Sequence, residues 1–197
     1  MASDTKKRIL DAALKVFAEK GYEATNVREI AEELGYTKSA LYKHYKSKEE
    51  IWDALIDKLD IHYEKHFGSL DNLPPIPASG EELVQLVNKM TSFTINDEHI
   101  RMIRKTVMME QFRGEKVRDL ATKHFLSGTR ILFMNIFDQM LEQGTLKKYD
   151  TAILAFELTA PITQLVHLCD RDPEKIPQVM RMIEVYTRHF VKVYCID

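Results

Sequence analysis

The sequence predicts an all-α protein of about nine helices. Its long segments repeat apolar residues at helical spacing, so each predicted helix has one stripe that can be buried. Glycine and proline account for only 7 and 6 of the 197 residues, which argues against disorder and against a turn-rich β-fold. Capping residues and glycines separate the periodic segments, as expected of a chain of connected helices.

The first two predicted helices lie close together. Residues 5–20 form the first helix, which ends at Gly21. Asn26 caps a second helix over 27–34, and Glu29 supplies the reciprocal half of a capping box.

A third short helix completes a recognisable motif. Gly35 ends the second helix, Thr37 caps the third over 38–45, and a capping serine opens a connecting helix over 48–66. A short helix, a turn with glycine and another short helix form a helix-turn-helix, whose second helix is presented to the major groove of DNA.

Residues 68–80 form the clearest linker, because they contain three of the six prolines and break the helical periodicity. We therefore expect a helix-turn-helix domain over 1–47, followed by the connecting helix, and a helical bundle over 68–197. Caps, stops and apolar periodicity predict the helices of this bundle over 81–95, 98–113, 116–143, 150–169 and 173–194. Pro161 should bend the fourth of these helices.

Charge, hydropathy and cysteine content restrict the function classes. Residues 1–52 carry ten cationic and nine anionic side chains, so an anion-binding surface must be a local patch. The chain has no run of about 18 apolar residues and no signal-peptide core, so we expect a cytoplasmic protein without a membrane partner. Cys169 and Cys195 lack a CxxC spacing and are expected to be free thiols on or near the core.

The predicted helix over 38–45 has a face suited to DNA. Leu41 and Tyr45 share one side and should point inward, which leaves a small, cationic side exposed. Small side chains let a recognition helix approach the bases, and lysine can reach phosphate or guanine. The candidate DNA-contacting residues here are Thr37, Lys38, Ser39, Ala40, Tyr42, Lys43, His44 and Lys48. A solvated helix surface is the alternative, but the agreement of spacing, caps and turn favours DNA.

Residues 5–52 resemble the DNA-binding domain of the TetR family of transcriptional regulators. The resemblance rests on G-Y-x-x-T, V-R-x-I-A-x-x-L-G and L-Y-x-H-Y-K-S-K-E-E-I, and it covers about a quarter of the chain. It implies a nine-helix fold, a homodimer and a small-molecule site in the C-terminal domain. It also implies DNA contacts by Thr25 and Arg28, and it suggests that Lys38 and Ser39 set the choice of operator. Asn26 replaces a residue that is more often Thr or Ser, and it can cap the helix equally well.

The C-terminal bundle is rich in methionine and phenylalanine, which can line an adaptable apolar pocket or fill an ordinary core. The pocket candidates are Met90, Phe93, Met109, Phe112, His124, Phe125, Phe133, Thr159, Gln164 and His167. The helices over 150–169 and 173–194 are apolar on more than one face, so we predict a two-fold homodimer through them. Its two recognition helices would address the half-sites of a pseudo-palindromic operator.

The sequence therefore predicts a DNA-binding transcriptional regulator, a repressor that an unknown small apolar or amphipathic ligand releases from duplex DNA. The alternative is a regulator with a filled core, controlled by a protein partner or by abundance. A helical enzyme is disfavoured because the titratable groups of the bundle are scattered. We expect no catalytic residue, no metal ion and no cofactor.

Overall fold

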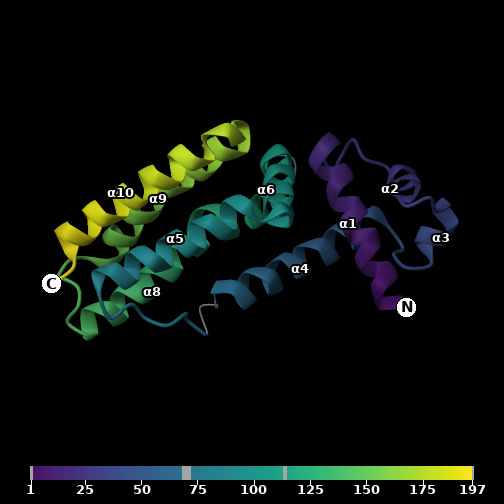
Figure 1. Ribbon diagram of the computed structural model, residues 1–197. Helices are drawn as coiled ribbons and strands as arrows, with labels where there is room; N and C mark the ends of the chain where they lie inside the picture. Colours follow the sequence, from purple (N-terminus) through teal and green to yellow (C-terminus); the bar gives the residue numbers. More distant parts are fainter. Residues whose placement is uncertain (1, 68–71, 113–114, 197) are drawn as a thin grey trace. The chain divides into compact units, whose positions relative to one another are not determined.

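The computed structural model describes residues 2–67, 72–112 and 115–196 (Figure 1). These residues form ten α-helices, a π-helical segment, a 3-10 turn and no β-strand beyond an isolated bridge between Leu146 and Cys195. The all-α prediction is therefore confirmed. The α-helices are α1 Ala2–Lys20, α2 Val27–Glu33, α3 Lys38–Tyr42, α4 Lys48–Phe67, α5 Gly80–Asn96, α6 Glu98–Glu110, α7 Glu115–Ala121, α8 Gly128–Glu142, α9 Thr151–Arg171 and α10 Ile176–Tyr194.

The chain folds into two compact units. The first contains residues 1–65 and 98–119, and the second contains residues 66–97 and 120–197. The chain therefore crosses from one unit to the other three times. Although α6 follows the linker in the sequence, it belongs to the first unit because it packs along α1.

The first unit is built around α1, which packs against both α2 and α6. Ile9, Ala13 and Phe17 are fully buried, so α1 is the centre of this core. The rings of Phe17, Tyr22 and Trp52 lie within 5.1 to 5.7 Å of one another, which joins α1 and the loop after it to α4. A carboxylate of α1, Asp11, also accepts a hydrogen bond from Lys58 of α4 at 3.1 Å.

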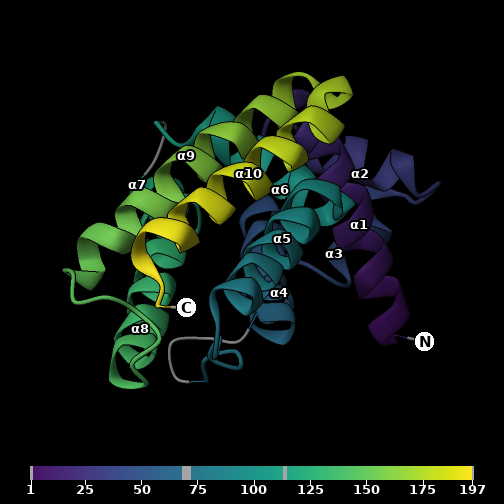
Figure 2. The ribbon, with the colours of Figure 1, turned by 60° about the vertical axis from the view of Figure 1, so that its left-hand side comes forward.

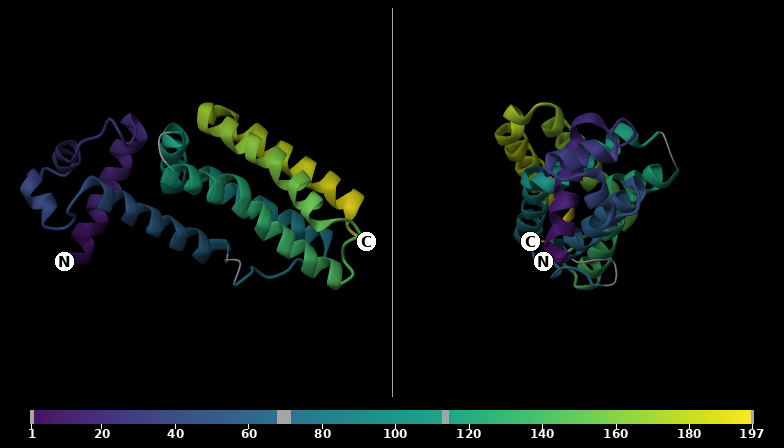
Figure 3. Two further views of the ribbon diagram at one scale, coloured as in Figure 1. Left: turned by 180° about the vertical axis from the view of Figure 1, so that it is seen from behind. Right: turned by 90° about the vertical axis from the view of Figure 1, so that its right-hand side faces the viewer.

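The second unit is a bundle of α5, α8, α9 and α10. The helices α9 and α10 lie side by side (Figure 2), and the view from behind shows the same pairing (Figure 3). The α8 helix packs on α9, and α5 packs on α10. Phe137 of α8 stacks on Phe190 of α10 with 5.7 Å between ring centroids, inside the hydrophobic core of this unit. Cys169 and Cys195 are buried free thiols, which confirms that prediction.

The predicted continuous helix over 116–143 is divided in three. Between α7 and α8, residues Thr122–Ser127 form a π-helical segment, in which the Gly128 amide donates to the Lys123 carbonyl. A side chain at position 128 would collide with that carbonyl oxygen, so the absence of a Cβ at Gly128 permits the segment. Apolar periodicity does not reveal this feature, because a π segment adds one residue to a turn without breaking the helix.

Two other boundaries differ from the prediction. The last helix starts at Ile176, after a 3-10 turn over Pro173–Lys175, and Asp172 makes no side-chain cap. The third helix, α3, is shorter than the predicted 38–45, although Thr37 caps it as expected. The predicted stop at Gly114 lies outside the described residues.

Candidate DNA-binding interface

The turn between α2 and α3 depends on Gly35, whose φ of 67° lies in the left-handed region that glycine adopts without strain. The amide of Tyr36 then donates to the Ala31 carbonyl at 2.8 Å, which closes the end of α2. The chain therefore turns sharply at this point and starts α3 at Lys38. This is the helix-turn-helix geometry that the sequence predicted.

The start of α2 is held by a complete capping box. The Asn26 side chain accepts hydrogen bonds from the amides of Arg28 and Glu29 at 2.9 and 3.1 Å. The Glu29 carboxylate in turn accepts from the Asn26 amide at 2.9 Å. This carboxylate also pairs with Lys20 of α1, and the hydrogen bond from Lys20 is the main reason that the pKa of Glu29 is lowered. The box thus fixes α2 relative to α1 as well as capping it.

The orientation of α3 follows from its two buried anchors. Leu41 is fully buried and Tyr45 is 4% exposed, so the side predicted to face inward does so. Thr37 accepts a hydrogen bond from the Ala40 amide at 3.2 Å. The opposite side presents exposed Thr37, Lys38, Ser39, Tyr42 and Lys43, with Ala40 and His44 half-buried. The amine of Lys38 lies 5.6 Å from the centre of the Tyr42 ring.

The structure gives the other predicted DNA-contacting residues internal partners. Thr25 is 2% exposed, and its hydroxyl donates to the Gly21 carbonyl at 2.7 Å. Arg28 is exposed, and it forms a helical ion pair with Glu32 at 2.8 Å. The Lys48 amine donates to the carbonyls of the α1–α2 loop, at 2.9, 3.4 and 3.0 Å from Tyr22, Glu23 and Thr25. DNA contact by these three side chains remains a prediction.

Lys48 belongs to a clamp that sequence analysis missed, formed by Tyr22, Lys48, Glu49 and Trp52. The Lys48 amine lies 4.3 Å from the centre of the Tyr22 ring, and the Tyr22 hydroxyl donates to Glu49 at 3.2 Å. Burial and the nearby Glu49 carboxylate raise the pKa of the Tyr22 hydroxyl, so it stays protonated and keeps donating. The G-Y-x-x-T signature contains Tyr22, but only the fold shows that Lys48, Glu49 and Trp52 of α4 contact its ring and hydroxyl.

The predicted pocket residues are not gathered in one place. Met109 and Phe112 belong to the first unit, and Phe112 is 91% exposed. Phe133 is buried in the core of the second unit, Thr159 donates to the Ala155 carbonyl, and Gln164 is exposed. Met90 packs against that core. Nδ1 of His167 lies 3.8 Å from a carboxylate oxygen of Asp170. Phe93 stacks on His66 with 4.2 Å between ring centroids. The side chains of His124 and Phe125 lie outside the described residues.

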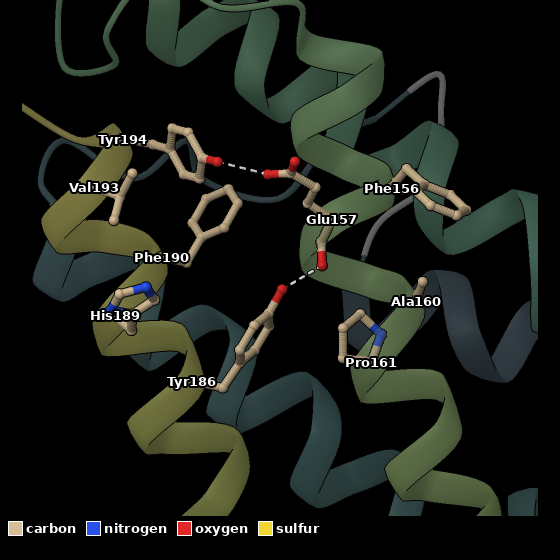
Figure 4. A pocket seen from close by; sticks show the side chains of 9 residues that line it. All are labelled: Phe156, Glu157, Ala160, Pro161, Tyr186, His189, Phe190, Val193 and Tyr194. Carbon is tan, nitrogen blue, oxygen red and sulfur yellow. Dashed lines mark hydrogen bonds between the residues drawn. The ribbon is translucent and has the colours of Figure 1, made fainter.

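A hollow of about 400 Å³ lies between α9 and α10 and is lined by none of these candidates (Figure 4). Pro161 of α9 has no amide hydrogen, so the carbonyl of Glu157, one turn earlier, lacks its helical donor. The Tyr186 hydroxyl donates to this carbonyl, and the Tyr194 hydroxyl donates to the Glu157 carboxylate at 2.7 Å. The rest of the wall is formed by Phe156, Ala160, His189, Phe190 and Val193.

Two other searches of the described part of the chain concern metals and membranes. It contains no group of three or more His, Cys, Asp or Glu side chains placed to hold a metal ion. Of its helices, α9 is long and apolar enough to cross a membrane by length and composition. This is weak evidence of insertion, because α9 packs against α5, α8 and α10 in the second unit.

Known proteins resemble the chain at both the sequence and the fold level. Residues 9–55 match the family described as bacterial regulatory proteins, tetR family. The HTH-type transcriptional regulator AcrR of Shigella flexneri is 30% identical over 122 residues, which are 58% of this chain and 53% of AcrR. The chain thus spans about half the length of that regulator.

Two solved structures share the fold over nearly the whole chain. SmeT, the repressor of the Stenotrophomonas maltophilia multidrug efflux pump SmeDEF, is 23% identical in its triclosan complex, with a TM-score of 0.74 over 98% of this chain and 93% of SmeT. FadR of Bacillus subtilis, in complex with stearoyl-CoA, is 20% identical and has a TM-score of 0.68. The match covers 94% of this chain and 97% of FadR. At these identities the likeness shows the fold alone.

Proposed function

The chain belongs to the TetR family of bacterial transcriptional regulators, and from that premise we propose that it is a cytoplasmic, sequence-specific repressor with no enzymatic role. A small apolar or amphipathic ligand bound in the second unit lowers its affinity for the operator. The observation that carries the DNA-binding part is the exposed side of α3, where Lys38, Ser39, Tyr42 and Lys43 surround a half-buried Ala40.

The exposed side of α3 enters the major groove. Ser39 and Ala40 are small enough to let the helix backbone approach the base edges, where Lys38 and Ser39 select the sequence. Lys43 contacts phosphate or guanine, and Tyr42 and His44 donate to phosphates at the rim of the groove. The hydroxyl of Thr37, at the start of α3, also contacts the DNA backbone.

The repressor acts as a homodimer through α9 and α10. Exposed apolar side chains on these two helices support this assembly, since Ile153, Phe156, Met182 and Val185 are each at least half exposed. A two-fold dimer presents two copies of α3 to a pseudo-palindromic operator, with half-sites about 34–36 Å apart or a multiple of this. A monomer at micromolar concentration in size-exclusion chromatography with light scattering would contradict the dimer.

Release from the operator requires a ligand that binds the DNA-competent and DNA-incompetent states with different affinities. The solved complexes of SmeT with triclosan and of FadR with stearoyl-CoA support an apolar or amphipathic ligand class. Of the predicted pocket residues with described side chains, Met90, Phe93, Phe133, Thr159, Gln164 and His167 belong to the second unit and remain our proposed lining. In the alternative function, side chains fill this core, no small molecule binds, and a protein partner or the abundance of the protein controls the regulator.

The DNA-binding part is tested with a double variant, Tyr42→Ala with Lys43→Ala. Duplexes are first selected from a random library by the wild-type protein, and affinities are then measured by gel shift. We expect at least about tenfold weaker binding, because a good base or phosphate contact contributes about 1–3 kcal/mol.

The chain offers a matched control, Lys148→Ala with Tyr149→Ala. These neighbouring side chains are an exposed lysine and an exposed tyrosine of the second unit, so the control makes the same chemical change away from α3. It should leave operator affinity unchanged. Equal affinities of the α3 variant and the wild type would show that the site is assigned wrongly.

A further inference from the structure

We propose that the first two turns of α1 are part of the DNA interface, with Arg8 contacting a backbone phosphate beside the start of α3. This inference rests on the proposed function. It adds Arg8, with Lys6 and Lys7 beside it, to the residues that bind the operator.

The first observation is the way in which cations of the first unit are paired. Lys15, Lys20, Arg28 and Lys58 each form an ion pair with an acidic side chain, at 2.5 to 3.1 Å. Six cations close to the helix-turn-helix form no ion pair within the described part of the chain: Lys6, Lys7, Arg8, Lys38, Lys43 and Lys46.

These six cations come from two segments, whereas Lys65 of α4 and Arg101 and Lys105 of α6, which also form no ion pair among the described residues, lie outside them. Residues 5–10 and 36–48 contain no acidic residue, and Asp4 on the first turn of α1 forms no ion pair either. A nearly neutral unit therefore carries a local cationic surface, which is the electrostatic footprint of a nucleic-acid site.

The second observation brings the two segments together. The guanidinium of Arg8 lies 5.8 Å from the centre of the Tyr36 ring, and its Nη1 donates to the Tyr36 hydroxyl at 3.3 Å. Lys6, half a turn earlier on α1, has its amine 5.2 Å from the centre of the Tyr45 ring. Since Tyr36 directly precedes the Thr37 cap, α1 places Arg8 at the N-terminal end of the recognition helix.

The chemistry of the Arg8–Tyr36 pair suits a phosphate. A guanidinium has five N–H donors, and the Tyr36 hydroxyl accepts one of them. Arg8 is exposed, and the planar fork of a guanidinium matches two phosphate oxygens. The Tyr36 hydroxyl accepts from Arg8, so its own hydrogen is free to donate to the same phosphate.

The salt dependence of operator binding tests this proposal. Dissociation constants of the full-length wild type and of Arg8→Gln are measured on a selected duplex at several salt concentrations between about 50 and 200 mM. Loss of one phosphate contact should make the slope of log K against log salt shallower by about 0.9 for each protomer bound. Binding should weaken by the same factor on specific and non-specific duplexes, because a phosphate contact does not read sequence.

Lys15→Gln is the matched control, because Lys15 lies on the same helix but pairs with Glu33. It should leave the salt slope unchanged, while Arg8→Lys should retain the slope and weaken binding through the lost fork geometry. If Arg8 only supports the fold, Arg8→Gln will lower the melting temperature and leave the slope of the remaining folded protein unchanged, which would overturn the proposal. Failure of the wild type to bind any selected duplex would instead overturn the proposed function.

Discussion

The hydroxyl of Tyr186 on α10 donates a hydrogen bond to the backbone carbonyl of Glu157 on α9 (Figure 4). That carbonyl needs a donor from outside its own helix, because Pro161 has no amide hydrogen to supply. Burial and the nearby Glu157 raise the pKa of the Tyr186 hydroxyl, so it remains a donor at neutral pH. A proline inside α9 is thus accommodated by a side chain of α10.

The first prediction is a coupling between Tyr186 and Pro161. Tyr186→Phe should lower the free energy of unfolding by about 0.5–1.5 kcal/mol, because it removes the hydrogen bond to the Glu157 carbonyl. In a Pro161→Ala background the restored amide can bond that carbonyl, so Tyr186→Phe should lower the free energy of unfolding by less than it does with proline at position 161. Urea unfolding of the four proteins at one protein concentration measures the coupling.

Tyr194→Phe is the matched control for this cycle. Its hydroxyl bonds the Glu157 carboxylate rather than the carbonyl, so its cost should be the same with proline or alanine at position 161. If Tyr186→Phe also cost the same in both backgrounds, Pro161 would not be the reason that Tyr186 is needed.

The second prediction concerns Gly128 at the end of the π-helical segment. Helix propensity alone predicts that Gly128→Ala stabilises the protein by about 1 kcal/mol. The structure predicts the opposite sign, a loss of about 1–3 kcal/mol, because the new methyl group would overlap the Lys123 carbonyl. Thermal unfolding measures the sign, and Thr129→Ala, an exposed change on the same turn, should stay within about 0.5 kcal/mol of the wild type.

The third prediction separates two lysines that the sequence places in the same motif. Lys48→Met removes a charged donor from three loop carbonyls and should lower the free energy of unfolding by about 1.5–3 kcal/mol. Lys43→Met changes an exposed side chain and should alter stability by less than about 0.5 kcal/mol while weakening operator binding. Equal stability of the Lys48→Met protein and the wild type would contradict the clamp.

The fourth prediction is a pH dependence at the α2 cap. Hydrogen bonds from Lys20 and from the Asn26 amide lower the pKa of Glu29 in the folded state. Its ionised form therefore adds stability above the ordinary glutamate pKa of about 4.3, and this stability disappears as the pH falls through the lower, folded pKa.

Unfolding of Glu29→Gln at several pH values checks this contribution. The variant should be less stable than the wild type at pH 7, and the difference should close in acid. Glu19→Gln changes an exposed carboxylate of α1 that forms no ion pair among the described residues, and it should show no such trend. A difference that persisted unchanged in acid would mean that ionisation of Glu29 is not its source.

Much of the first unit was predictable because its determinants are local. A capping box involves two residues that are three positions apart in the sequence. A left-handed turn at the end of a helix is predicted by a single glycine between two segments with helical periodicity. Asn26, Gly35 and Thr37 therefore marked the helix-turn-helix before any contact was known. The inward direction of Leu41 and Tyr45 followed from helical spacing alone.

The features that were missed depend on partners far away in the sequence. Arg8 and Tyr36 are 28 residues apart, and Lys48 and Tyr22 are 26 apart. Chain order also assigned the segment over 98–113 to the second domain, whereas its helix α6 packs on α1. The predicted pocket residues were selected by composition, which does not tell a core phenylalanine such as Phe133 from an exposed one such as Phe112.

The sequence by itself determined the all-α class, the helix-turn-helix and the exposed side of α3, since each follows from spacing within a few residues. Only the tertiary structure decided which cations are paired, which donor serves the Glu157 carbonyl, and which helices make up each unit. Those outcomes depend on side chains that meet across helices, and such meetings are set by the packing of the whole chain.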